Sequence, residues 1–141
     1  MYKRKSICKY TVEGRQAIHK NLKFEEYVLW VMSQLQYNYQ STDSIEFTDN
    51  KVSLYAAQYG KCAILGEVLE IDYIHCHHKV PKKIGGKDNY QNLIIIHKDV
   101  HRLIHATKQE TISKYLSLLK LNKQQISKVN KLRKMVGNET I

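Results

Sequence analysis

The fold of this chain is decided by residues 74–105, which read IHCHHKVPKKIGGKDNYQNLIIIHKDVHRLIH. A histidine-rich segment and a short apolar segment flank a loop that holds the only proline and the glycine pair Gly85 and Gly86. Because glycine accepts positive φ, this loop predicts a tight return between two strands. Leu93 to Ile96 is expected as the second strand, and Asp99 to Ala106 as a short helix. The stretch therefore predicts the order strand, loop, strand, helix.

The chain before this stretch is predicted to be mostly helical. Apolar residues recur at helical spacing from Phe24 to Tyr37. The segment from Asn38 to Asn50 is rich in Asn, Ser, Thr and Asp and is expected as a connection. Asp49 or Asn50 is expected to cap a helix that runs to Gly60. Beyond it, residues 62–66 and 68–77 are expected as short strands that meet at a turn.

The chain after this stretch predicts two further helices. Thr111 to Leu121 repeats apolar residues at helical spacing, and Asn122 with Gln125 resembles a capping box before a helix that ends near Gly137. The expected fold class is therefore α+β, a small strand–strand–helix core flanked by helices. We expect three parts, which are residues 1–50, 51–106 and 107–141.

Composition limits the class of protein. The chain has 141 residues, of which 43% are hydrophobic and 26% charged, as in an ordinary globular domain. Its apolar runs fall far short of the roughly 20 residues that span a bilayer, so we expect a soluble protein without a membrane partner. The start is basic without the apolar core of a secretion signal, and the 3 cysteines do not form a disulfide framework. We therefore expect a reducing intracellular compartment, the bacterial cytoplasm or an organelle.

The net charge of +10 is unevenly distributed. Both ends of the chain and the histidine-rich stretch are basic, whereas residues 24–78 are acidic. Basic surfaces gain free energy by releasing the counterions condensed on nucleic-acid phosphates. This distribution favours a nucleic-acid partner, although a solvated basic surface would have the same composition.

The histidines predict a metal site. Six of the 7 histidines lie between positions 75 and 105. His101 and His105 are four residues apart, which places both on one face of a helix, and His77 and His78 end a predicted strand. Three imidazoles around one ion leave coordination positions open for water and substrate, as catalytic sites require. An isolated histidine pair more often belongs to a surface or a core, but this combination favours a site.

This ordered set of residues, spread over positions 60–106, resembles the HNH nuclease family and its ββα-metal motif. The resemblance implies a metal-dependent endonuclease that hydrolyses DNA phosphodiester bonds. It implies that His78 is the general base, that Asn92 holds the loop and orients the base, and that His77, His101 and His105 bind the metal ion. A histidine is suited to take a proton from water because its unperturbed pKa of about 6.5 is near neutrality.

The cofactor expected at these residues is one divalent metal ion. Abundance favours Mg²⁺, and imidazole ligands also suit Zn²⁺, Mn²⁺ or Ni²⁺. His75 and His97 are expected outside the ligand set, and Cys76 is expected to be structural. Basic side chains that surround the site suit phosphate contacts, or equally a solvated surface, and they are Lys79, Lys82, Lys83, Lys87, Lys98 and Arg102.

The chain departs from the family pattern where many HNH domains bind a structural zinc with two Cys-x-x-Cys pairs. The corresponding positions here hold Cys62 with Leu65 and His97 with Val100. Aliphatic side chains cannot coordinate zinc, so a structural zinc is not expected. We expect apolar packing in its place and an inert, buried Cys62 thiol.

A second resemblance lies at the N-terminus. Residues 6–22, SICKYTVEGRQAIHKNL, followed later by Gly60-Lys-Cys62, look like a segment of group II intron-encoded maturases near their DNA-binding and endonuclease regions. The resemblance implies that residues 1–50 form a DNA-binding appendage and that the enzyme is related to homing endonucleases. It implies DNA as partner, and intron RNA or a reverse transcriptase as further partners. The Tyr-x-Asp-Asp motif of the polymerase does not occur, and 141 residues cannot hold a reverse transcriptase. We therefore do not expect this chain alone to copy RNA.

Two other functions stay open at this point. The chain could be a non-catalytic nucleic-acid-binding remnant of a maturase, because the zinc cysteines of the family pattern are missing. It could also be a structural zinc-finger-like protein that uses Cys62, Cys76 and histidines, and such a protein would unfold when its metal is chelated.

Overall fold

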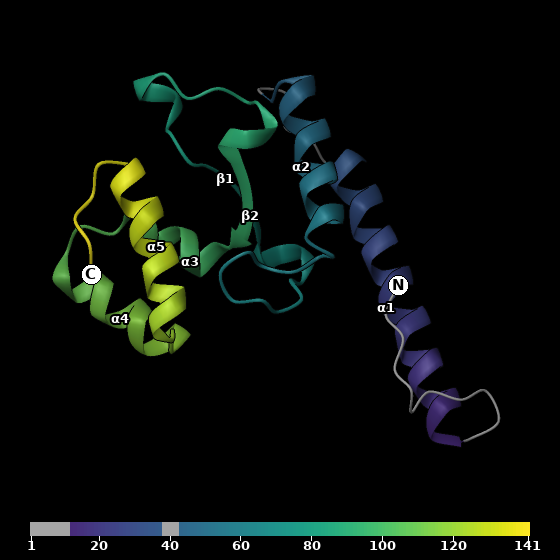
Figure 1. Ribbon diagram of the computed structural model, residues 1–141. Coiled ribbons are helices and arrows are strands. Elements are labelled where there is room, and N and C mark those ends of the chain that lie inside the picture. The colour runs from purple at the N-terminus through teal and green to yellow at the C-terminus, as the bar shows by residue number, and fades with distance from the viewer. Residues whose placement is uncertain (1–11, 38–42) are drawn as a thin grey trace.

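The structure is a computed structural model that describes residues 12–37 and 43–141, with side chains of the first helix described from Phe24 onward. It is an α+β fold, as the sequence predicts (Figure 1). Its elements, in chain order, are α1 (Val12–Tyr37), α2 (Ile45–Ala57), β1 (Ile74–His78), β2 (Leu93–His97), α3 (Lys98–His105), α4 (Gln109–Leu119) and α5 (Lys123–Met135).

The centre of the fold is a two-stranded antiparallel sheet with α3 packed on it. Strand β1 pairs with β2 so that Ile74 faces His97 and His78 faces Leu93. Helix α3 follows β2 directly and contacts both strands. Side chains alternate between the two faces of a strand. In β1, His75 and His77 therefore face α3, whereas Cys76 points to the opposite face, where it joins the apolar core.

The first two helices differ in detail from the sequence prediction. Helix α1 begins at Val12, well before Phe24, and the prediction for residues 38–42 lies outside the described residues. Helix α2 begins inside the predicted connection, and its N-cap is Ser44 instead of Asp49 or Asn50. The Ser44 hydroxyl accepts the backbone N–H of Phe47 at 2.9 Å, which satisfies one of the free donors of the first turn.

Of the two strands predicted at residues 62–66 and 68–77, the first is wrong and the second is confirmed only from Ile74 onward, as β1. Between α2 and β1 the described backbone forms one isolated bridge, Lys61 to Val68, and a 3₁₀ turn over Ile71–Tyr73. The reason lies at the free edge of β2. The Gln58 side chain bonds both the N–H and the C=O of Ile95, and the N–H of Ala63 bonds the same C=O. These groups occupy the hydrogen-bonding positions that a third strand would need.

The C-terminal helices agree with the sequence prediction. Helix α5 begins with the predicted capping box, in which Asn122 and Gln125 each accept the other's backbone N–H. From α5, the side chain of Val129 packs into the core, where it joins Leu103 and Ile104 of α3. In the described part of the chain, no helix has both the length and the apolar character that crossing a bilayer requires.

Candidate metal centre

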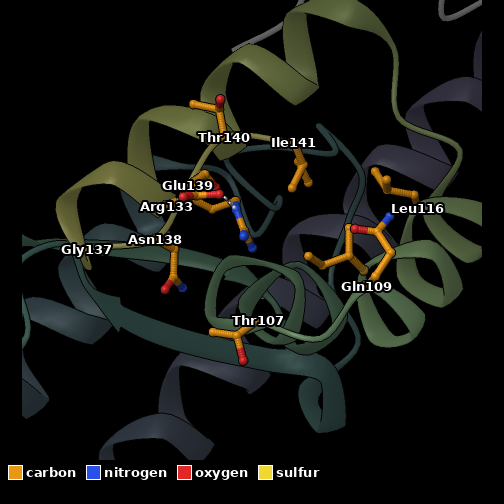
Figure 2. Close-up of a pocket in the computed structure, with 10 residues that line it drawn as sticks. Thr107, Gln109, Leu116, Arg133, Gly137, Asn138, Glu139, Thr140 and Ile141 are labelled. Atoms are coloured by element: carbon orange, nitrogen blue, oxygen red, sulfur yellow. Dashed lines mark hydrogen bonds between the residues drawn. The ribbon is translucent and has the colours of Figure 1, made fainter.

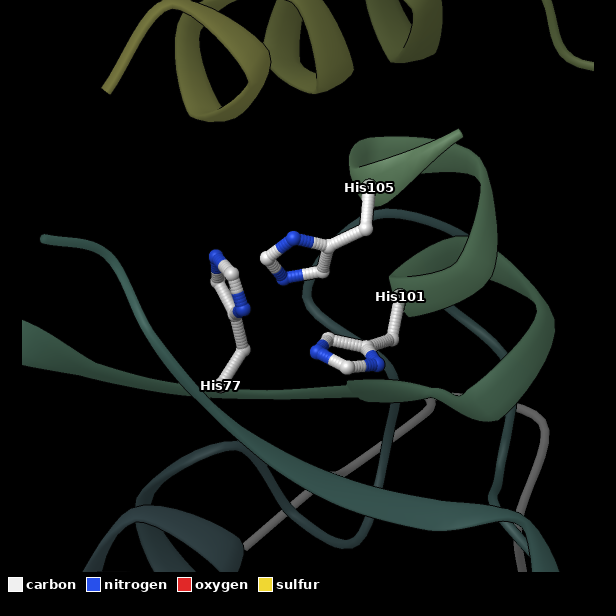
Figure 3. Close-up of side chains that lie close together, drawn as sticks. All are labelled: His77, His101 and His105. Atoms are coloured by element: carbon white, nitrogen blue, oxygen red, sulfur yellow. The ribbon is translucent and has the colours of Figure 1, made fainter. Parts of the chain in front are cut away.

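Three imidazole rings converge where β1 meets α3. His77 comes from the strand and His101 and His105 from successive turns of the helix, and each offers one nitrogen within 4.8 Å of the other two (Figure 3). Their ring centroids are 4.5 to 5.4 Å apart. His77 is buried, whereas His105 is exposed, so the cluster opens to solvent on one side. We call these three residues the imidazole cluster.

One atom of the imidazole cluster lacks a partner. The Nε2 atom of His77 is buried without any hydrogen bond among the described residues. A buried polar atom without a partner costs about 1–3 kcal/mol, so such atoms are rare in native proteins. An ion held by the cluster would give this nitrogen a partner. The three donors therefore fit a divalent cation with open coordination positions.

The surroundings keep these histidines neutral. Burial first, and then the nearby His105 and His75, lower the pKa of His77 from 6.5 to about 3. Burial, with His75 and His105 next, lowers the pKa of His101 to about 3 as well. Burial also lowers the pKa of His105. Neutral imidazole is the form that binds metal ions, so the cluster is ready to bind one near neutral pH.

A fourth histidine lies against the imidazole cluster. The ring of His75 stacks on that of His101, with centroids 3.7 Å apart. Burial is the main reason that the pKa of His75 falls to about 4. The sequence analysis placed His75 outside the ligand set, and it is not among the three convergent donors. The spacing of two residues between His75 and His77 in a strand could have indicated their common face.

His78 does not join the imidazole cluster. It belongs to a second group, in which its Nε2 lies 2.7 Å from Asp88 and its ring stacks on Phe47 at 5.2 Å. Asp88 also accepts a hydrogen bond of 2.7 Å from the Ser44 hydroxyl and lies 3.3 Å from Lys82. Although partial burial raises the pKa of Asp88, these bonds outweigh it and lower that pKa. Asp88 is therefore a carboxylate held beside His78, and the sequence analysis missed it.

Asn92 holds the loop that joins the strands. Its side-chain oxygen accepts the N–H of Val80 at 2.9 Å, and its amide nitrogen donates to the carbonyls of Val80 and Lys87 at 3.1 and 2.9 Å. Its own carbonyl accepts the N–H of Lys79. One side chain thus ties the two ends of the loop together beside His78.

The C-terminal part of the chain holds the helix of the imidazole cluster in place. Arg133, on α5, is buried and donates to the carbonyls of Leu103 and Ala106 at the end of α3. It also donates to the Glu139 carbonyl at 2.7 Å, beside a cavity of about 430 Å³ between α4, α5 and the C-terminal residues (Figure 2). A cation there satisfies the free carbonyls of a helix C-terminus. Nothing in the sequence pattern indicated this contact.

The predicted phosphate-binding side chains lie on two elements. Lys79, Lys82, Lys83 and Lys87 lie in or next to the loop, and Lys98 and Arg102 lie on α3. Lys82 pairs with Asp88 and Arg102 with Asp99, each at 3.3 Å. In the described part of the chain no carboxylate lies within 4 Å of the remaining four.

Cys62 occupies the position where the family pattern has a zinc cysteine. It is 2% exposed, and its sulfur accepts the N–H of Leu65 at 3.4 Å and that of His97 at 3.3 Å. Val100 is fully buried beside the same apolar core. The His97 ring accepts the N–H of Asp99 and caps α3. Cys62 is thus buried in an apolar region, as the sequence predicts, and the two hydrogen bonds to its sulfur are an addition that the sequence did not indicate.

Comparison with known proteins agrees with this geometry. Neither the curated proteins nor the solved structures give a match to the chain. A family model described as HNH endonuclease matches residues 60–107, about a third of the chain. This range holds all three residues of the imidazole cluster, together with His78, Asp88 and Asn92. The ββα unit of this chain is therefore similar to that of HNH endonucleases.

Proposed function

We propose that this chain is a metal-dependent endonuclease that hydrolyses phosphodiester bonds of DNA. One observation carries the proposal. Three neutral imidazoles converge inside the region that matches the HNH model, and one of them has a buried nitrogen without a partner. Structural zinc normally takes four protein ligands, whereas three leave room for a substrate oxygen.

In this proposal His77, His101 and His105 hold the cation. When bound, a divalent cation supplies positive charge that offsets the charge gathering on the phosphate. The donors are nitrogens, and no carboxylate belongs to the cluster among the described residues. Imidazole suits Zn²⁺ or Ni²⁺ better than Mg²⁺, which prefers oxygen ligands. The donor set thus favours a transition metal over the Mg²⁺ that abundance predicts.

His78 acts as the general base in this proposal, and Asp88 positions it. Because a carboxylate only accepts, the 2.7 Å contact assigns the proton of neutral His78 to Nε2 and leaves Nδ1 free to take a proton from water. Phe47 stacks on the ring and limits its rotation. His77 and His78 are the last two residues of β1, and their side chains leave the strand on opposite faces. A phosphodiester would therefore have to bind across the end of β1 to reach both the base and the cation.

Exposed lysines of the loop and α3 would bind the phosphates on either side of the cleavage point. Lys83, Lys87 and Lys98 are exposed and unpaired with carboxylates in the described part of the chain. Each phosphate contact releases counterions, so binding should weaken steeply with salt. DNA is thus the partner proposed for this surface.

We also propose a relation to group II intron endonucleases, with residues 1–50 as a DNA-binding appendage and with intron RNA or a reverse transcriptase as further partners. The support is the sequence of residues 6–22, whose side chains lie outside the described residues. An intracellular location belongs to the same proposal. Crosslinking the chain to a group II intron ribonucleoprotein would test it.

A non-catalytic DNA-binding remnant is the second candidate, favoured by the loss of zinc ligands at Leu65 and Val100. A zinc finger built on the cysteines has less support, since Cys76 packs in the apolar core and neither Cys62 nor Cys76 belongs to a metal-binding group of the described residues.

The test is digestion of supercoiled plasmid by the full chain over a panel of cations that includes Mg²⁺, Mn²⁺, Ni²⁺ and Zn²⁺. We expect nicking that EDTA abolishes, whereas gel-shift binding persists in EDTA. His78→Ala should abolish nicking and keep binding, and Lys128→Ala on α5 is the matched control. Binding without nicking under every cation would favour the non-catalytic remnant.

A further inference from the structure

The loop between β1 and β2 carries an exposed aliphatic side chain. Ile84 is 65% exposed and ends the 3₁₀ turn Lys82–Ile84. Figure 1 shows the loop at the top of the view, projecting from the strands. A single exposed aliphatic residue is common on protein surfaces. The structure around Ile84 is what makes it notable.

The backbone of this loop is tightly held. The carbonyl of Pro81 accepts the N–H groups of Ile84 and Gly86, at 3.1 and 2.9 Å. A Cβ at Gly86 would lie 1.7 Å from the carbonyl oxygen of Val80, so only glycine fits this close approach. Asn92 closes the loop at its base. Ile84 is therefore presented on a rigid support and not on a loose segment.

Positive charge surrounds this apolar side chain. Lys83 and Lys87 are exposed, and no carboxylate of the described chain lies within 4 Å of either. Lys82 lies 3.3 Å from Asp88, which in turn contacts His78. Lys82 lies two residues before Ile84, so the turn that carries Ile84 is linked to His78 through Lys82 and Asp88.

We propose that Ile84 is a wedge that enters the minor groove of duplex DNA and unstacks one base step next to the bond to be cut. Proteins that kink DNA insert aliphatic side chains between base steps in this way, and lysine contacts to phosphates position such a protein on the duplex. A rigid wedge loses little conformational entropy on insertion. This inference rests on the proposed function and adds how the substrate is deformed.

The test uses short duplexes with a flexible TA step at the centre and 2-aminopurine placed at successive positions around it. The full chain is added in EDTA, so that binding occurs without cleavage. We expect wild type to raise 2-aminopurine fluorescence at one step. Ile84→Ala should lose this rise, while its affinity changes less than about threefold, because the lost burial and the avoided unstacking offset each other.

Two control variants distinguish the effect of the Ile84 wedge from the effects of aliphatic surface and of positive charge elsewhere. Leu118→Ala removes an aliphatic side chain that is 60% exposed on α4, and it should keep the fluorescence rise. Lys83→Ala should keep the rise and reduce the salt dependence of binding by about one phosphate contact. These variants change exposed side chains, so the fold should be retained.

The outcomes distinguish the two proposals. A rise that persists in Ile84→Ala overturns the wedge. If wild type nicks plasmid with a cation but unstacks no step, the wedge is overturned and the endonuclease proposal stands. If wild type neither binds nor nicks DNA, the endonuclease proposal fails and the wedge fails with it.

Discussion

Two regions of the ββα unit correspond to metal sites of the HNH pattern, but in the described chain only one of them holds a set of donors. The imidazole cluster retains three nitrogens, one of them buried and without a partner in the described chain. In the second region, Cys62 contacts the N-cap residue of α3, His97, and its sulfur already accepts two backbone N–H groups. A donor set that includes a buried nitrogen without a partner predicts a ligand, whereas a buried thiol that already has its hydrogen bonds predicts a packed core.

The largest expected effect comes from removing one donor of the imidazole cluster. His101→Ala should reduce cation affinity by at least about tenfold and plasmid nicking by about a thousandfold, because charge on the phosphate is no longer offset. Isothermal titration with Zn²⁺ and the nicking assay measure the two effects. Unchanged metal binding in this variant would remove His101 from the ligand set, and Lys128→Ala is again the control.

The next largest effect is on stability against pH in the metal-free protein. The pKa of His77 and His101 is about 3 in the folded chain, below the unfolded value of 6.5. Above 6.5 both states are neutral and stability is complete. As pH falls from 6.5 toward about 3, only the unfolded chain binds these protons. The free energy of unfolding therefore decreases by up to about 1.4 kcal/mol per pH unit for each of the two histidines.

Urea unfolding in EDTA at a series of pH values measures this slope. His101→Gln should make it shallower, since one depressed histidine is gone. Val100→Ala, in the other region, should lower stability equally at every pH. A wild-type curve that stays level between pH 6.5 and about 4 would contradict the neutral, buried state of the cluster.

The comparison can be reversed by restoring donors beside Cys62. The double variant Leu65→Cys with Val100→Cys should bind a second equivalent of Zn²⁺, because three thiolates and His97 would then occupy the four positions where the family pattern binds zinc. At a hundredfold excess of zinc over Kd, the added site should raise stability by about 2.7 kcal/mol. Native mass spectrometry counts the ions. The matched serine double variant should bind one, and a cysteine variant with one ion would show that this region cannot hold metal.

The fold was predictable where local pattern and tertiary contacts agree. The capping box of Asn122 and the strand at Leu93 follow from sequence alone. The cap of α2 was mistaken although Ser44 makes an ordinary local cap to Phe47, whereas its second bond, to Asp88 44 residues away, could not be predicted from the local pattern. The expected third strand does not form, because the Gln58 side chain bonds the backbone of Ile95, 37 residues away, at the free edge of β2. Contacts of this range leave no periodic trace in the sequence.

The candidate site, like the fold, was only partly predictable from the sequence. The spacing of His101 and His105 and the order of the motif predicted the imidazole cluster. The Asp88 partner of His78 and the Arg133 contact with α3 depend on side chains that meet only in the folded chain. Their residue types are common, so no spacing rule distinguishes them from surface charges.

The smallest expected effect tests the filled region itself. Cys62→Ala leaves the N–H groups of Leu65 and His97 without their acceptor and removes a buried sulfur, so the free energy of unfolding should fall by about 1–2 kcal/mol. Cys62→Ser keeps an acceptor and should lose less. Urea denaturation measures stability, and titration with Zn²⁺ should give the wild-type stoichiometry in both variants. Because this thiol has its partners within the protein, a lost equivalent of metal in Cys62→Ala would mean that the two regions are one coupled site.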